Sequence, residues 1–244
     1  AALAAEWRAV ADALVDGYDP ATGVYEQFRG FDDLEPLIIT ELADPPIAAD
    51  VLLGHDRVHG AQVVKQADVL MLHHLVPDET EPGSLVPNLD HYHPRTAHGS
   101  SLYPAIHASL LARAGRTEEA RDLLALSCRL DLGDLTRSTS EGLHVATMGG
   151  VWQALVFGFL GVRALADGFS VDPRLPERWR RVRVRFRLQG RRVRVVVGHD
   201  ELEVDVDGPL PVHVPGLGPM TVTPPGARFT RRGTTWSLRE GGPS

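Results

Sequence analysis

The chain has 244 residues, a net charge of −7 at pH 7, 43% hydrophobic residues and 23% charged residues. This balance is typical of a globular protein with a substantial core and excludes a disordered chain. The negative charge argues against a nucleic-acid partner, because duplex binding depends on basic surfaces that displace counterions. One cysteine, Cys128, excludes an internal disulfide and fits a reducing compartment.

Targeting and membrane signals are absent from this sequence. No run of about 18 apolar residues occurs, and the first residues lack the basic-then-apolar layout of a signal peptide. We therefore expect a cytoplasmic protein with no membrane partner. The sequence opens without methionine, in a pattern typical of the middle of a helix. We expect that residue 1 is not the natural beginning of the protein.

Helical patterns come first in the chain. Apolar residues from Leu3 to Val15 fall on one helical stripe, which ends at the turn residues 16–20. A long loop follows as far as Pro45 and Pro46, and loops of that length inside compact domains are usually functional. Four further helices are expected, over residues 66–74, 101–114, 117–130 and 144–166.

The periodicity changes near residue 169. Residues 182–188 alternate between Val, Phe or Leu and Arg, and a second apolar run at 193–197 follows Gly190, which predicts a hairpin. The arginines between 178 and 194 are interpreted as the solvated face of these strands. Further strands are expected at 202–206, 212–214, 220–222 and 234–238. The expected fold is mainly α over residues 1–168, followed by an antiparallel β-sandwich over 169–244; no βαβ rhythm occurs, which argues against a parallel-sheet enzyme.

Lys65 is the only lysine in a chain that uses arginine for every other permanent side-chain cation. A compact ammonium differs from a flat guanidinium when it must reach one ligand oxygen in a confined site. We therefore interpret Lys65 as a candidate ligand-binding residue. The alternative is an accident of an arginine-rich composition.

A second candidate lies where a polar loop meets the helix expected near residue 102. His98, Gly99, Ser100 and Ser101 stand at this junction. The free N–H groups of a helix start, with hydroxyls and a histidine beside them, suit phosphate or a carboxylate. The alternative is that Ser100 is a plain helix cap and His98 a surface residue.

Other polar clusters give weaker signals. His144 also follows a polar loop and begins a helix, where Ser140 or Glu141 could instead serve as a cap. His91 and His93 lie in an expected loop without a second cluster, so we expect no zinc site. Several carboxylates lie in the long loop near its aromatic residues, but no pair stands out as a glycosidase acid and base. They are Glu26, Asp32, Asp33 and Glu35.

Four separated motifs together resemble one family in their order and spacing. They occupy residues 25–31, 65–68, 96–102 and 141–159. The family is glycoside hydrolase family 65, the maltose, trehalose and kojibiose phosphorylases. The resemblance implies an (α/α)6 barrel followed by a β-sandwich, with this chain forming the C-terminal part of the barrel and the sandwich. It also implies inverting phosphorolysis of an α-glucoside to β-glucose 1-phosphate, with inorganic phosphate as co-substrate and no other cofactor.

Site residues follow from the same resemblance. Lys65 and Gln66 would bind the glucosyl unit, and the phosphate would be held by a cluster at the helix start. This cluster consists of His98, Ser100 and Ser101. His144 and Glu26 are carried over on weaker grounds. The family often has aspartate where Gly99 stands and serine where Tyr103 stands, so the phosphate contacts are expected to differ in detail.

The family's general acid is a glutamate in a Pro-Asp-Glu-Tyr-type motif upstream of the matched region. The sequence Pro77-Asp78-Glu79-Thr80 is neither that motif nor in that place. We therefore expect no catalytic acid in this chain and name the missing N-terminal part of the enzyme as its partner. Homodimers are common in the family, although neither the oligomeric state nor the cleaved linkage can be read from the sequence.

Two alternatives to a phosphorylase remain at this point. A hydrolase on the same scaffold would need a carboxylate base, which residues 98–101 do not supply. A non-catalytic carbohydrate-binding fragment would explain why no general acid is found.

Overall fold

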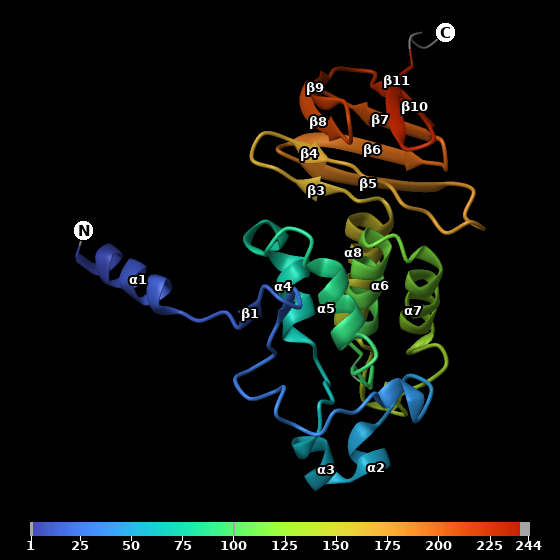
Figure 1. Ribbon diagram of the computed structural model, residues 1–244. Helices are drawn as coiled ribbons and strands as arrows, with labels where there is room; N and C mark the ends of the chain where they lie inside the picture. The colour runs from blue at the N-terminus through green and yellow to red at the C-terminus, as the bar shows by residue number, and fades with distance from the viewer. Residues whose placement is uncertain (1, 100, 240–244) are drawn as a thin grey trace. The chain divides into compact units, whose positions relative to one another are not determined.

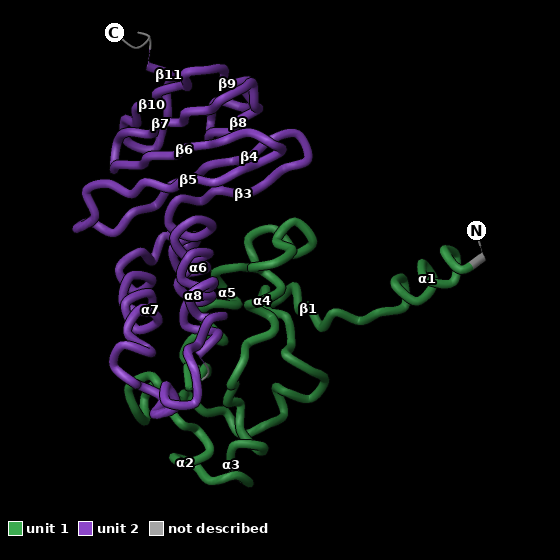
Figure 2. Tube along the Cα trace, turned by 180° about the vertical axis from the view of Figure 1, so that it is seen from behind, with its two compact units in different colours: residues 1–100 green, residues 101–244 purple. Residues whose placement is uncertain are grey.

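The computed structural model describes residues 2–99 and 101–239. The chain divides into two compact units, residues 1–100 and residues 101–244 (Figure 2). Residue 168, where a domain boundary is expected, lies inside the second unit, and that boundary stays a prediction. Within the described ranges, no helix is long and apolar enough to cross a membrane.

The first unit begins with helix α1, Ala2–Ala13 (Figure 1). The predicted apolar stripe is present, but Trp7 is 66% exposed and Val10 is 58% exposed. The expected helix was too long, because Leu14 and Val15 lie beyond its end. A small antiparallel hairpin follows, and its strands are β1 (Tyr18–Asp19) and β2 (Val24–Tyr25).

Short helices and long connections make up the rest of this unit. The elements are the 3-10 helix η1 (Ile39–Glu41), the helices α2 (Ala49–Leu53), α3 (His55–Gly60) and α4 (Asp68–Leu75), the 3-10 helix η2 (Pro77–Glu79) and the helix α5 (Leu85–Tyr92). Helix α4 matches the prediction for 66–74, although it starts two residues later. Helices α2, α3 and α5 were not predicted.

Isolated parallel bridges connect the irregular segments of the first unit. They pair Glu35 with Ala61, Ile47 with His98 and Val64 with Thr96. A small core lies among these segments and is formed by Leu37, Ile39, Ile47, Ala61 and Ala97. The long loop predicted up to residue 46 is therefore held in place by backbone hydrogen bonds to segments far away in the sequence.

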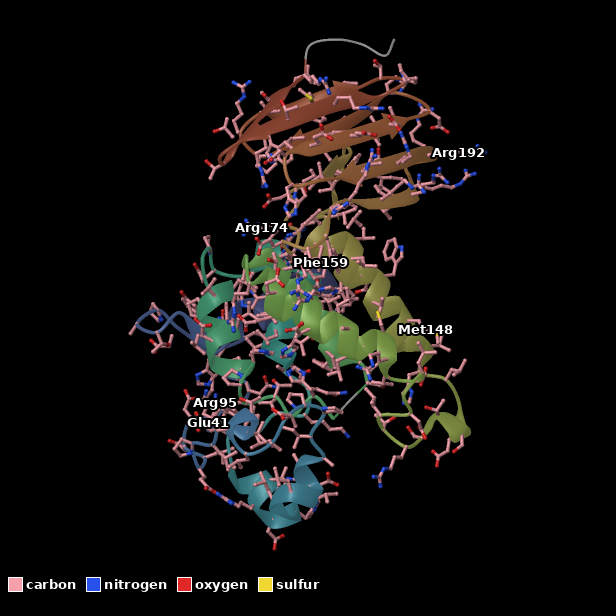
Figure 3. All side chains as sticks on the ribbon, turned by 90° about the vertical axis from the view of Figure 1, so that its right-hand side faces the viewer. Glu41, Arg95, Met148, Phe159, Arg174 and Arg192 are labelled. Carbon is pink, nitrogen blue, oxygen red and sulfur yellow. The ribbon has the colours of Figure 1, made fainter. Side chains whose placement is uncertain are left out.

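The second unit begins with helices. They are α6 (Tyr103–Arg113), α7 (Thr117–Arg129), the 3-10 helix η3 (Thr139–Glu141), α8 (Val145–Gln153) and the π-helix η4 (Ala154–Phe159). Met148 on α8 is 49% exposed, whereas Phe159 at the end of η4 is fully buried (Figure 3).

The last predicted helix ends earlier than expected. Residues 144–166 were predicted as helical, but the helix stops at Phe159 and a strand begins at Arg163. Gly161 has a φ of +61°, and a Cβ on it would lie 2.1 Å from the carbonyl oxygen of Asp172. Because only glycine fits such a close backbone approach, the chain turns here instead of continuing the helix.

The β-structure that follows forms a five-stranded and a four-stranded sheet, with strand orders β11-β10-β7-β6-β5 and β3-β4-β8-β9. The strands are β3 (Arg163–Ala164), β4 (Phe169–Ser170), β5 (Val182–Leu188), β6 (Arg191–Val197), β7 (Glu201–Val206), β8 (Leu210–Val214), β9 (Gly218–Val222), β10 (Ala227–Arg232) and β11 (Thr235–Leu238). All pairs are antiparallel except β4 with β8. Strands β3, β4 and β10 were not predicted.

The predicted hairpin is confirmed. Strands β5 and β6 pair from Val182 opposite Val197 to Leu188 opposite Arg191. Gln189 and Gly190 close the turn with φ angles of +48° and +76°, as a two-residue hairpin loop requires. The arginines of β5 are exposed, whereas Phe186 packs edge-on against Phe169 of β4 with ring centroids 5.7 Å apart. The helical part followed by antiparallel sheets therefore agrees with the expected fold.

Candidate functional site

Lys65 and Gln66 lie immediately before helix α4, and both are exposed. The residues on either side are anchored in the core, since Val64 is 5% exposed and Ala67 is fully buried. The apolar residues therefore fix the backbone while the two polar side chains face solvent. Their binding of a sugar stays a prediction.

Gln27 ties this segment to the long loop. Its side-chain amide donates to the backbone oxygen of Gln66 at 3.2 Å and to the Asp68 carboxylate at 3.4 Å. Its side-chain oxygen accepts from the N–H of Val69 at 3.5 Å. No role for Gln27 was predicted from the sequence, although this residue lies inside the first motif. The only signal was its position next to Glu26.

A parallel bridge brings the lysine motif next to the histidine motif. The Val64 N–H donates to the oxygen of Arg95 at 2.9 Å, and the Val64 oxygen accepts from the N–H of Ala97 at 3.0 Å. Lys65 and His98 therefore lie on adjacent backbone segments of the first unit. Whether both motifs serve one site stays a prediction.

His98 differs from the surface residue considered as an alternative, because only 1% of it is exposed. Burial, together with the nearby His93, lowers the pKa of His98 to about 3. Its ring centroid lies 5.2 Å from that of His93, and its φ is +51°. His98 is therefore neutral at pH 7, so that it can offer a ligand a hydrogen bond but no positive charge.

Gly99 occupies a position that no side chain could share. A Cβ on this residue would lie 2.4 Å from the backbone oxygen of Ile47. Ile47 is fixed there because its N–H donates to the oxygen of Ala97 at 2.8 Å. This contact explains why glycine is required at position 99.

Glu26 has a local structural role. Its carboxylate accepts from the N–H of Gly30 at 2.7 Å and so closes the turn between the two residues. The preceding Tyr25 is buried and is held by Asn88, whose side-chain oxygen accepts the Tyr25 N–H at 3.0 Å. These contacts position the first motif, and any contact of Glu26 with substrate stays a prediction.

His91 and His93 were expected in a loop. His91 lies in helix α5 and His93 is the residue that ends this helix. The helix was missed because Pro87 and Asn88 are typical of turns. Pro87 lies in the first turn of α5, where proline is tolerated.

In the second unit, Ser101 and His144 lie at the starts of two neighbouring helices. Thr147 connects them, because its hydroxyl donates to the oxygen of Ser101 at 2.7 Å and its N–H donates to the oxygen of His144 at 2.9 Å. Further along, a Cβ on Gly150 of α8 would lie 3.0 Å from the Cβ of Ala105 in α6. The contacted residue moves from Ser101, just before α6, to Ala105 in α6 as its partner moves from Thr147 to Gly150 in α8. The two helices are therefore parallel, with their N-termini side by side.

Asp131 is the second-unit residue that the sequence analysis missed. One of its carboxylate oxygens accepts the N–H of His144 at 2.9 Å, and the other lies 2.5 Å from the ring Nδ1 of the same residue. The hydrogen bond from the His144 side chain is the main cause that lowers the pKa of Asp131. Asp131 follows Leu130, the C-cap of α7, and is 13 residues from His144, beyond the reach of a helical or turn pattern.

The predicted site residues thus fall into two groups. Lys65, Gln66, Glu26 and His98 belong to the first unit, whereas Ser101 and His144 belong to the second. Ser100 lies outside the described residues. The phosphate cluster of His98, Ser100 and Ser101 therefore stays a prediction.

Comparison with protein families gives two matches, one to the helical part of the chain and one to the β-structure that follows it. The glycosyl hydrolase family 65 central catalytic domain matches residues 1–153, and the C-terminal domain of the same family matches residues 162–217. The chain belongs to glycoside hydrolase family 65. Members of this family are carbohydrate-active enzymes, which agrees with the resemblance of the four motifs.

Curated relatives of this family 65 chain include phosphorylases. The chain is 35% identical to a kojibiose phosphorylase of Halothermothrix orenii over 199 residues, covering 82% of this chain and 26% of the relative. It is 31% identical to an α,α-trehalose phosphorylase of Thermoanaerobacter brockii, covering 78% of this chain and 24% of the relative. The chain thus spans about a quarter of the length of these relatives.

A solved structure supports the same assignment at the level of the fold. The family 65 chain matches a structure described as "Putative kojibiose phosphorylase from human microbiome" with a TM-score of 0.84 and 27% identity. The match covers 93% of this chain and 32% of the other. It supports the interpretation of the helical part as a portion of a helical barrel followed by a β-domain.

Proposed function

We propose that this chain forms the sugar-binding and phosphate-binding part of an inverting α-glucoside phosphorylase. The reaction converts an α-linked glucosyl disaccharide and inorganic phosphate to β-glucose 1-phosphate and a free sugar. The observation that carries the proposal is the pair of parallel helices α6 and α8, which begin side by side with Ser101 and His144 at their starts. Helix N-termini attract anions, because their free N–H groups and dipoles point toward the same region.

Lys65 and Gln66 are proposed to bind the glucosyl unit. Both are exposed at the start of α4, and Gln27 holds their backbone through its contact with Gln66. An ammonium with three donors suits hydroxyl oxygens that differ in direction. His98, on the adjacent segment, is proposed to bind phosphate with Ser100 and Ser101; because it is buried and neutral, it would offer phosphate a hydrogen bond and no charge.

The proposed chemistry requires one bond to form as another breaks. A phosphate oxygen attacks the anomeric carbon from the face opposite the leaving sugar, so the product has the β configuration. The bond from the anomeric carbon to the leaving oxygen breaks, and a general acid protonates that oxygen. We propose that this acid, a glutamate, is supplied by polypeptide outside the present sequence. Inorganic phosphate is the only co-substrate, and we propose a cytoplasmic location for the reaction.

A hydrolase on the same scaffold is the second candidate, and one observation favours it. A carboxylate paired with an imidazole, as in Asp131 and His144, can act as a general base toward water. Such an enzyme would release glucose without phosphate. The phosphorylase is preferred because two helix N-termini meet at His144, which favours an anion over a neutral water.

The test uses the full-length protein with kojibiose, trehalose and maltose, each in the presence and absence of inorganic phosphate. We expect β-glucose 1-phosphate to form only with phosphate. Glucose release that is independent of phosphate would support the hydrolase. An intact full-length protein that binds these sugars but cleaves none of them would support a non-catalytic carbohydrate-binding role.

A further inference from the structure

Both carboxylate oxygens of Asp131 contact the same residue, His144. Oδ2 accepts the backbone N–H of His144 at 2.9 Å, and Oδ1 lies 2.5 Å from the ring Nδ1. The Asp131 side chain is 14% exposed and that of His144 is 21% exposed. The pair is therefore partly shielded from water, and Asp131 contacts His144 at two points, its backbone N–H and its ring.

The end of helix α7 holds Asp131 in place. Leu130, the residue before it, is 2% exposed and anchors the chain in the core of the second unit. The N–H of Leu135 donates to the oxygen of Leu130 at 3.0 Å, and the N–H of Gly133 donates to the oxygen of Arg129 at 2.8 Å. The carboxylate thus projects from a hydrogen-bonded turn, which makes it suitable for orienting another side chain.

The other ring nitrogen of His144 faces hydroxyl groups. Its Nε2 lies 3.5 Å from the hydroxyl oxygen of Ser138, which in turn is 2.8 Å from the hydroxyl oxygen of Thr136. The contact of 3.5 Å is at the limit of a hydrogen bond, so Ser138 does not saturate Nε2. An incoming ligand can compete for this nitrogen at the start of α8.

A simple helix cap does not account for this arrangement. Oδ2 of Asp131 accepts the backbone N–H of His144, which is one of the free N–H groups at the start of α8. The second oxygen contacts the ring instead, as carboxylates do when they fix the tautomer of a ligand-binding histidine. The geometry therefore combines a cap with control of the imidazole.

We infer that Asp131 is a positioning residue, which orients His144 so that its Nε2 donates a hydrogen bond to bound phosphate. This inference rests on the proposed function, because it takes phosphate as the anion. A ring that donates from Nδ1 to Asp131 and from Nε2 to phosphate carries two protons. The Asp131 carboxylate balances this positive charge, and Ser138 and Thr136 supply neutral hydroxyls beside it.

The experiment compares Asp131→Asn with the wild type in the full-length protein. Asparagine is nearly isosteric and can still accept the N–H of His144, but its amide cannot balance a doubly protonated ring. We expect the KM for phosphate to rise about tenfold or more, by analogy with the loss of metal affinity when the carboxylate that orients a metal-binding histidine is replaced. The KM for the disaccharide should change by less than about threefold, because the substitution is expected to weaken phosphate binding and to leave sugar binding intact. Asp131→Glu, which keeps the carboxylate, should have a lower phosphate KM than Asp131→Asn.

Asp134→Asn is the matched control. Asp134 lies in the same loop and accepts the N–H of Thr139 at 3.0 Å, and its φ of +45° is one that asparagine tolerates. This variant should leave the phosphate KM unchanged. An equal loss in both variants would overturn the inference, since it would assign the effect to the loop. So would an unchanged phosphate KM in Asp131→Asn.

A spectroscopic arm separates this inference from the proposed function. In protein with ¹⁵N-labelled histidine, the ring signals of His144 are assigned by their loss in His144→Gln. We expect a proton on Nδ1 in the wild type, a second on Nε2 when phosphate is added, and loss of the Nδ1 proton in Asp131→Asn. If the wild type neither binds nor consumes phosphate, the proposed function and the anion role both fail. The Nδ1 signal then still tests whether Asp131 orients the ring. An Nδ1 proton that persists in Asp131→Asn would overturn the positioning role of Asp131.

Discussion

Val64 and Thr96 form a parallel backbone bridge. The N–H and the carbonyl oxygen of Val64 bond to Arg95 at 2.9 Å and to Ala97 at 3.0 Å, the two neighbours of Thr96. This contact joins two motifs that are well separated in sequence. It places the single lysine of the chain and the buried His98 on neighbouring segments of the first unit. The proposed placement of the sugar-binding Lys65 beside the phosphate-binding His98 depends on this connection.

Replacing Lys65 with arginine should reduce kcat/KM of the full-length protein by about tenfold to a hundredfold, the value of one hydrogen bond to a charged group. The positive charge is kept, but a planar guanidinium cannot place its donors as an ammonium does. Steady-state kinetics with the preferred disaccharide measure the change. Arg183→Lys on the exposed face of β5 is the control and should have wild-type kinetics. Equal rates for Lys65→Arg and wild type would remove the argument from the lone lysine.

Gln27→Glu should raise the KM for the disaccharide more than the KM for phosphate. The side-chain amide of Gln27 donates to Gln66 and lies 3.4 Å from a carboxylate oxygen of Asp68. A glutamate there would place two carboxylates together and displace the segment that carries Lys65. Separate titrations of the two substrates check this prediction. A larger effect on phosphate would contradict the assignment of the segment to sugar binding.

His98 should make the stability of the protein sensitive to acid. Its pKa is lowered to about 3, whereas a histidine in an unfolded chain titrates near 6.5. Between these values only the unfolded state binds the proton, so this group's stabilising contribution is complete above about pH 6.5. As the pH falls from there toward 3, the contribution is lost by about 1.4 kcal/mol per pH unit.

The variant that tests this effect is His98→Asn, because asparagine tolerates the φ of +51°. Its free energy of unfolding, from urea denaturation at pH 6 and pH 4, should fall less than that of the wild type. His55→Asn, at an exposed position, should show the wild-type fall. Identical acid sensitivity of His98→Asn and wild type would show that the histidine is not buried as described.

The close packing of η4 against α6 gives a prediction on stability. A Cβ on Gly158 would lie 2.7 Å from the Cα of Ser109, whereas a Cβ on Gly149 of α8 would meet no atom within 4 Å. Gly158→Ala should therefore destabilise the protein by about 1–3 kcal/mol or more, as overpacking does. Gly149→Ala should be neutral or stabilising by up to about 1 kcal/mol, because alanine favours a helix. Thermal unfolding compares them, and equal melting temperatures would contradict the described packing.

Much of the fold could be predicted from local patterns. The hairpin of β5 and β6 follows from alternating Val and Arg around Gln189 and Gly190, and the core helix α6 from its apolar run. Helix α5 was missed because its first turn contains Pro87. The early end of the last helix was missed because it depends on the contact of Gly161 with Asp172, which lies outside any local window.

The candidate site was predictable in its residues but not in its connections. Lys65 stands out by composition, and Ser101 and His144 by their positions before helices. The roles of Gln27 and Asp131 depend on hydrogen bonds to residues that are distant in sequence, so a single sequence carries no direct signal for them. The burial of His98 likewise follows from tertiary packing and not from the polar loop that precedes it.

The phosphate dependence of disaccharide cleavage by the full-length protein tests the central claim most directly. Kojibiose, trehalose and maltose are each incubated with and without inorganic phosphate, and glucose and β-glucose 1-phosphate are quantified. Phosphorolysis predicts that β-glucose 1-phosphate forms in step with disaccharide consumption and that neither occurs without phosphate. Release of glucose at the same rate without phosphate would contradict the proposal.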